Sequence, residues 1–177
     1  MRLSRFFALI LFCLTANTVT AGPADPSRFD GSRSPAQKAV YHFNFATPDD
    51  AMKGLKRVKN HLKALKAFGD PKNSHIVVVL NGNELHAFSR LNQEVFSEIY
   101  PQLKSLSEQG VDVRVCRNAG RARGYEPDQF YDLVTVVPAA VSELARLQNQ
   151  GYAYLHIELN PRMTRKDLIA EYAELGM

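Results

Sequence analysis

Short apolar runs that alternate with longer amphipathic stretches constrain the fold more than any other feature of this chain. The segment 76–80 is continuously apolar and rich in β-branched residues, as expected of a strand that is covered on both faces. Strands that alternate with helices of this length indicate an α/β fold with a mainly parallel sheet and right-handed crossovers. The other predicted strands are residues 40–45, 111–116, 133–137 and 152–157.

Start and stop signals define the first two predicted helices. Thr47-Pro48 provides an N-cap and a first helical residue, and Gly69 ends that helix. A second helix is predicted over 93–109, with Val95 facing the core. Pro101 either kinks this second helix or marks its true start.

The second half of the chain carries further helix signals. A short helical turn is predicted around 128–131, and Pro138 opens a helix with Val141 facing the core. Thr164 begins a helix-capping pattern that predicts a C-terminal helix through Leu175.

The first 21 residues have the pattern of a secretory signal peptide. Arg2 and Arg5 precede an apolar run at 6–14, and small residues lead to an expected cleavage after Ala21. The run is shorter than the roughly 20 residues that a membrane-spanning helix needs. We therefore expect a periplasmic or secreted protein with no membrane span after cleavage.

Composition limits the partners of the remaining chain. Loss of the two leader arginines lowers the formal net charge from +4 to +2, which is too little to indicate nucleic acid or an anionic membrane as partner. Residues 22–38 are rich in Pro, Ser, Ala, Asp and Gly, and they predict a flexible segment. The rest is long enough for one domain with a real core.

Cys116 is the candidate reactive residue. The other cysteine, Cys13, lies in the expected leader, so the mature chain has a single thiol at the last position of the strand 111–116. Binding sites of parallel sheets gather at the carboxyl ends of the strands. A loop follows and enters a helical turn, whose free N–H groups would favour a thiolate. Four arginines nearby in sequence could add positive potential: Arg114, Arg117, Arg121 and Arg123. Most free cysteines are small buried hydrophobes, and this second interpretation remains open.

Two further features lie near this strand end. The stretch that contains Gly120 and Arg121 either binds an anion through backbone N–H groups and guanidinium or is a solvated basic loop. His86 follows the loop of the neighbouring strand and could approach Cys116. No histidine or cysteine pair has the spacing of a metal site, so we expect neither a metal nor a cofactor.

Six segments carry a recognisable pattern of residues and spacing: 41–44, 58–62, 76–82, 113–118, 134–148 and 151–155. Their order resembles the DsrE/DsrF-like family over residues 39–157. The resemblance implies a doubly wound, mainly parallel five-stranded α/β domain that assembles into trimers or hexamers. It also implies sulfur trafficking, in which a cysteine carries a persulfide and passes the sulfur on. Cys116 matches the family's cysteine, and Gly82 and Asn118 match accompanying positions that shape the loop edge.

The chain also departs from the family pattern. Asn81 stands where many relatives have histidine, residues 158–177 form a helical extension beyond the usual domain, and the leader indicates export whereas the family's sulfur relays are cytoplasmic. We expect a periplasmic sulfur carrier or sulfurtransferase in which Cys116 is the nucleophile. Arg117 and loop N–H groups would stabilise its thiolate, and Asn118 would orient the edge.

Sulfur would pass to or from a protein or a small sulfur compound. The alternatives are a non-catalytic module that binds a small anion or a partner protein, and a thiol redox sensor that forms a disulfide between copies.

Overall fold

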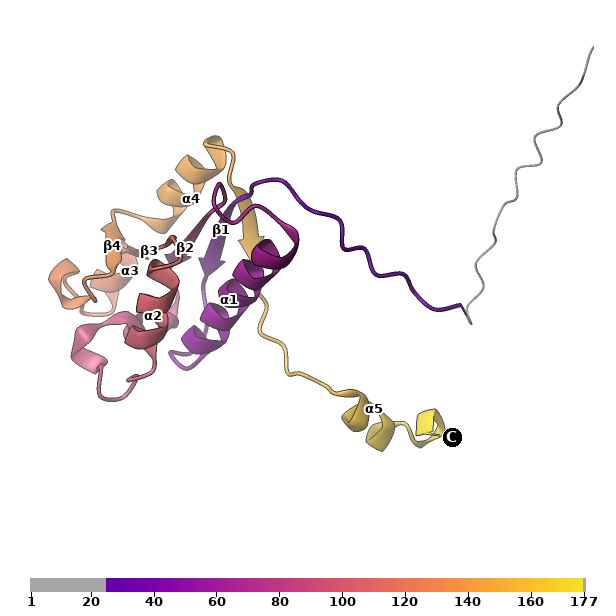
Figure 1. Cartoon of the computed structure of the whole chain (residues 1–177). Coiled ribbons are helices and arrows are strands. Elements are labelled where there is room, and N and C mark those ends of the chain that lie inside the picture. The colour runs from indigo at the N-terminus through magenta and orange to yellow at the C-terminus, as the bar shows by residue number, and fades with distance from the viewer. Residues whose placement is uncertain (1–24, 177) are drawn as a thin grey trace, which may run out of the picture. The chain divides into compact units, whose positions relative to one another are not determined.

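A parallel β-sheet is the centre of the computed structural model, which describes residues 25–176 (Figure 1). The expected leader and Cys13 lie outside the described residues. The chain divides into two units, 1–31 and 32–177, and the described residues of the first unit form no helix or strand. The strands of the second unit are β1 (Lys38–Phe43), β2 (His75–Leu80), β3 (Val111–Cys116), β4 (Val134–Val137) and β5 (Ala153–His156).

All neighbouring strands are parallel, in the order β4-β3-β2-β1-β5. The chain steps outward from β1 to β4 and then returns to place β5 on the other side of β1. The register pairs His42 with His156 and Cys116 with Val137. The prediction of a five-stranded, doubly wound parallel sheet is therefore confirmed.

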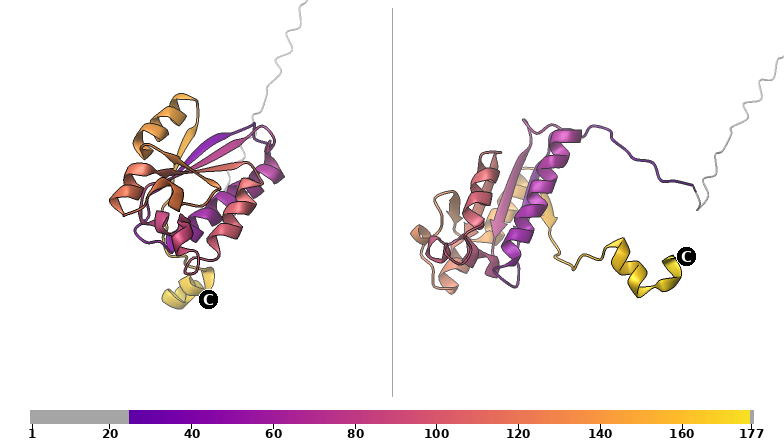
Figure 2. Two further views of the ribbon diagram at one scale, coloured as in Figure 1. Left: turned by 90° about the vertical axis from the view of Figure 1, so that its left-hand side faces the viewer. Right: turned by 60° about the horizontal axis from the view of Figure 1, so that its bottom comes forward.

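Helices cover both faces of the sheet (Figure 2). Helices α1 (Asp50–Phe68) and α2 (Ile99–Ser107) lie on one face, and α4 (Ala140–Asn149) lies on the other. Helix α3 (Arg117–Ala122) directly follows β3, and α5 (Arg165–Glu171) follows the sheet. The 3₁₀ helices are η1 (Asn83–Phe88), η2 (Arg90–Asn92), η3 (Pro127–Gln129) and η4 (Ala173–Gly176).

The sheet separates two clusters of buried side chains because successive residues of a strand face opposite sides. In β2, Ile76, Val78 and Leu80 belong to the cluster on the α1–α2 side. Val77 and Val79 belong to the cluster on the α4 side. This arrangement explains why β2 is apolar without interruption.

The start of α1 differs from its prediction. The helix begins at Asp50, with Asp49 at the N-cap position and no side-chain cap. Thr47 does not cap it, because its hydroxyl donates to Asp50 Oδ2 at 2.9 Å. Pro48 still contributes to this entry, since its carbonyl accepts the N–H of Ala51 at 3.0 Å.

The predicted second helix is shorter than expected. Helix α2 begins only at Ile99, so Pro101 lies in its first turn, where a missing N–H breaks no helical bond. Residues 93–98 form turns instead, and Val95 is 76% exposed rather than in the core. Val141 of α4, also expected in the core, is 74% exposed. The apolar periodicity misplaced both valines, because Val95 precedes α2 and Val141 lies on a side of α4 that faces solvent.

Hydrogen bonds fix the chain before β1, within the stretch 22–38 that its composition predicts as flexible. Ser34 N–H donates to Phe68 O at 2.7 Å, and Gln37 N–H donates to Ser74 Oγ at 2.9 Å. Arg33 donates to the carbonyl of Gly69. These bonds lie within the second unit, and side-chain composition alone does not reveal such backbone partners.

The segment after β5 leaves the sheet with Ile157 and Leu159 packed against the α1–α2 cluster. The predicted capping pattern opens α5, because Asp167 N–H donates to Thr164 Oγ1 at 3.2 Å and Thr164 N–H donates to Asp167 Oδ2 at 2.8 Å. Helix α5 has no buried residue. Within residues 25–176, no helix combines the length and the apolar character needed to cross a membrane.

Candidate functional site

Cys116 lies at the junction of β3 and α3, at the carboxyl edge of the sheet. It is the N-cap residue of α3, and its Sγ accepts a hydrogen bond from Ala119 N–H at 3.4 Å. The sulfur thus takes the place that a serine or aspartate oxygen usually has at a helix start. The sequence predicted a loop here. The helix has only six residues, and its glycine and dense arginines are not a typical helix pattern.

The Cys116 side chain is buried, with 3% of its surface exposed. It belongs to the apolar cluster on the α4 side, together with Val79, Ala140 and Leu144. The strand end therefore carries the thiol, as predicted, but the side chain packs beneath α4 instead of facing solvent.

The predicted residues around Cys116 differ in their exposure and partners. Arg117 and Asn118 are exposed in the first turn of α3. Gly120 is buried against Phe130, since a Cβ at this position would lie 3.2 Å from the ring. Arg121 is 4.0 Å from the carboxylate of Glu126, and both side chains are largely exposed. Gly120 therefore serves packing, and nothing within the described residues joins it to an anion site.

Arg123 connects α3 with the loop that follows β2. Its Nε donates to Asn83 Oδ1 at 2.9 Å, and its Nη1 donates to Ala119 O at 3.1 Å. The guanidinium of Arg123 thus joins the loop that contains Gly82 to the helix that follows Cys116. The sequence placed Arg123 among the nearby arginines but did not predict this bridge.

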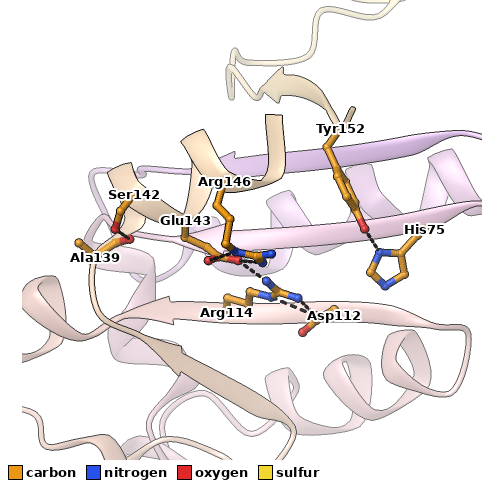
Figure 3. A network of polar contacts seen from close by, with 8 residues as sticks. All are labelled: His75, Asp112, Arg114, Ala139, Ser142, Glu143, Arg146 and Tyr152. Atoms are coloured by element: carbon orange, nitrogen blue, oxygen red, sulfur yellow. Dashed lines mark hydrogen bonds and ion pairs between the residues drawn. The ribbon is translucent and has the colours of Figure 1, made fainter. Parts of the chain in front are cut away.

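Arg114 lies on the same side of the sheet as Cys116, the α4 side, but its guanidinium is paired with carboxylates (Figure 3). It forms ion pairs with Asp112 of its own strand and with Glu143 of α4. Arg146 Nε also donates to Glu143 Oε2, at 2.9 Å. Hydrogen bonds from Arg146 and Arg114 hold the pKa of Glu143 below its usual value although the side chain is buried. Arg114 therefore binds β3 to α4 and adds no free positive charge to the thiol.

Glu84 is the buried residue at this edge that the sequence reasoning missed. Its carboxylate has no exposed surface and accepts three backbone hydrogen bonds. The donors are Phe45 N–H at 2.7 Å, Gly82 N–H at 2.8 Å and Asn81 N–H at 2.9 Å. A carboxylate two residues after the glycine of a turn was the local signal, because such side chains cap free backbone N–H groups.

Gly82 is required by the close approach of the two loops. A Cβ at this position would lie 2.4 Å from Phe45 N and 2.6 Å from Phe45 O. Because these are backbone atoms, no side-chain movement relieves the overlap. The close approach of these loops thus requires glycine at position 82, and the Glu84 carboxylate holds the two loops together.

His86, which could approach Cys116 according to the sequence, has another partner. Its Nδ1 shares a hydrogen bond with Tyr125 Oη at 2.8 Å, and Asn92 Nδ2 donates to the same oxygen at 2.7 Å. No hydrogen bond joins His86 to the sulfur in the part of the chain that the structure describes. His86 therefore ties η1 to the loop after α3.

Four surface cavities of the described residues lie away from the thiol. Four cavities of about 360 to 580 Å³ are lined by residues of α1, α2, η2 and the segments beside them, and Cys116 lines none of these four. Among residues 25–176, no group of three or more His, Cys, Asp or Glu side chains is placed to hold a metal ion.

Comparisons with known proteins agree with the observed architecture. The model of the DsrE/DsrF-like family matches residues 39–157. The structure of MTH1491, a protein of unknown function from Methanobacterium thermoautotrophicum, is similar with a TM-score of 0.57 and 25% identity. That match covers 68% of this chain and 99% of the other. A comparison with curated proteins found no match.

Proposed function

Because the chain belongs to the DsrE/DsrF-like family, we propose that it is a sulfur carrier or sulfurtransferase that acts through Cys116. Family membership supports a sulfur-related role in general. The observation that carries the finer proposal is the position of the thiol. Cys116 Sγ lies where β3 ends and α3 begins, accepts an N–H of that helix, and is followed by exposed Arg117 and Asn118.

The proposed step is a thiol–disulfide type of exchange at sulfur. The Cys116 thiolate attacks the sulfane sulfur of a persulfide donor, a new S–S bond forms, and the donor's S–S bond breaks to release its thiolate. With thiosulfate as donor, sulfite leaves instead. An acceptor thiolate then attacks the outer sulfur of the Cys116 persulfide and regenerates the Cys116 thiolate. No net oxidant or reductant is needed.

Transfer requires the junction of β3 and α3 to open, because Cys116 is buried. The covering cluster includes Ala140, and Ala119 packs against it. Both are small, so a modest local displacement of the first turn of α3 or of α4 exposes the sulfur. Openings of this size are within the range of native-state fluctuations.

We also propose that the protein is exported and that it exchanges sulfur with a donor and an acceptor. The leader pattern supports export to the periplasm or beyond, where the donor and the acceptor are a small sulfur compound or another protein. The family resemblance supports a trimer or a hexamer. The N-terminal sequence of the protein recovered from a periplasmic fraction tests the export proposal, and an intact Met1 in the cytoplasmic fraction contradicts it.

Intact-mass measurement tests the sulfur-carrier proposal directly. The protein is incubated with thiosulfate or glutathione persulfide, and the wild type is expected to gain the mass of one sulfur atom, which a reductant removes. Cys116→Ser should not gain it, whereas Cys13→Ser, in protein that retains residue 13, should gain it as the wild type does. No added sulfur, or equal addition to Cys116→Ser, refutes the proposal.

The burial of Cys116 favours one alternative, a binding module in which the thiol is only packed. The labelling rate of the native protein by a thiol reagent distinguishes the two functions. A rate close to that of a denatured control supports a reactive thiol. Labelling that proceeds only on global unfolding supports the binding module. A disulfide-linked dimer on non-reducing gels of periplasmic extract would instead support the redox sensor.

A further inference from the structure

A basic cavity lies between α1 and the segment that follows β5, away from Cys116. It has a volume of about 460 Å³ and is lined by Lys53, Lys56, Arg57, Asn60, Leu159 and Arg162, among others. We propose that this cavity binds an oxyanion group, such as a phosphate or a sulfur oxyanion, free or carried by a larger molecule.

Side chains from distant parts of the sequence create the cavity. Lys53, Lys56 and Arg57 project from one side of α1, because residues three and four apart are neighbours on a helix. Arg162 reaches the same cavity from beyond β5. Leu159 is packed against the α1–α2 cluster, so the segment that presents Arg162 is anchored to the domain. The cavity is thus part of the fold of the second unit.

Three of the four cationic side chains that line this cavity have no acidic partner among the described residues. Of the described residues that line it, none is acidic. Lys53 pairs with Asp50 at 2.7 Å, but no ion pair or hydrogen bond joins the side chain of Lys56, Arg57 or Arg162 to another described residue. Like charges at this spacing repel one another on a helix, and a bound anion relieves the repulsion.

The chemistry of the lining residues specifies the ligand class. Two guanidinium groups provide planar pairs of donors that match the oxygens of phosphate-like and sulfate-like groups. Lys56 adds a mobile positive charge, and the amide of Asn60 adds neutral donors. The volume lies within the range of small-molecule sites, so it accommodates more than a single ion.

Isothermal titration of the purified protein with pyrophosphate and with thiosulfate tests the site, at constant ionic strength set with chloride. The double variant Arg57→Gln/Arg162→Gln removes a guanidinium from each wall. The double variant Lys63→Gln/Lys72→Gln removes the same charge from exposed positions outside the four cavities. We expect saturable binding of at least one probe, weakened about tenfold or more in the arginine pair and little changed in the lysine pair.

Vesicles then identify the source of the oxyanion. Sedimentation with phosphatidylcholine vesicles is compared with and without phosphatidylglycerol. Retention that requires the anionic lipid, is lost in the arginine pair and is displaced by pyrophosphate assigns a lipid headgroup. Binding of a soluble probe without retention assigns a soluble oxyanion. Absence of any saturable binding, or equal weakening by both double variants, overturns the proposal.

Discussion

Glu84 holds three backbone N–H groups of two loops with a single carboxylate that solvent does not reach. In Glu84→Gln the amide oxygen can accept on one side only, and the NH₂ group then faces a backbone donor. A buried donor without an acceptor costs about 1–3 kcal/mol. We therefore expect Glu84→Gln to lower the free energy of unfolding by about 2–3 kcal/mol, measured by urea denaturation at neutral pH.

The control for Glu84 is Glu94→Gln, an identical chemical change at an exposed position. Its unfolding free energy should stay within about 0.5 kcal/mol of the wild type. Equal stability of the two variants would show that the carboxylate does not lock the edge. If the prediction holds, Glu84 supports the site through the loops and not through contact with the thiol.

For single residues, the sequence predicted the position of a reactive side chain better than it predicted the burial and the partners of that side chain. Its strand pattern placed Cys116 at the carboxyl edge, and the structure confirms that position. Burial beneath α4 could not be predicted, because it depends on how a helix 24 residues further along crosses the sheet. Glu84 was missed for the same reason, since one of its donors belongs to Phe45, in a loop distant in sequence.

The contact between β3 and α4 depends on an ion pair and not on apolar packing alone. Glu143→Gln removes a carboxylate that Arg146 and Arg114 both contact, and it leaves Arg114 partly uncompensated. We expect a loss of about 2–3 kcal/mol in unfolding free energy at neutral pH. Glu126→Gln, which removes an exposed carboxylate 4.0 Å from Arg121, is the matched control and should be nearly neutral.

The effect of Glu143→Gln should depend on pH in one direction. The pKa of Glu143 in the folded protein lies below the ordinary value of 4.5. Its stabilising contribution is therefore complete above pH 4.5 and is lost as pH falls through the lower folded-state pKa. Denaturation curves at a series of pH values should show the wild type and the variant converging in acid. A constant difference would contradict the role of the charge.

Helix α5 depends on its own cap because none of its residues is buried. Thr164→Ala removes the hydroxyl that accepts Asp167 N–H, which typically costs a helix about 1 kcal/mol. Hydrogen exchange of the α5 amides should become faster, while the unfolding midpoint of the domain stays unchanged. The control is Thr135→Ala, the same chemical change at an exposed position of β4, outside α5. A lowered domain midpoint in Thr164→Ala would mean that α5 supports the core.

The elements were predicted best where a single local signal determined them. The strand Val111–Cys116 and the capping box of Thr164 with Asp167 have the predicted positions. Predictions failed where the start or the orientation of a helix depended on distant contacts: exposed Val95 precedes α2, and exposed Val141 lies on the outer side of α4. The short helix α3 was missed because a cysteine N-cap is not a recognised start signal.

The proposed assembly is tested on the intact molecule. Val95 and Val141 are exposed in the single chain, and burial of such side chains is a common driving force of association. Light scattering coupled to size exclusion should give a mass of three or six chains, with 19.8 kDa for one full-length chain. A monomer mass across the accessible concentration range contradicts the proposal.

The position of β5 beside β1 has a consequence for how the molecule comes into being. His42 and Tyr154, which share a hydrogen bond across these strands, are 112 residues apart. Synthesis makes β1 first, yet one edge of β1 stays unpaired until residues 153–156 emerge. Closing so long a loop is slow, and an open strand edge is prone to pair with other chains. The sheet therefore reaches its final width only after β5 has been made, and a chain truncated before Ala153 should aggregate.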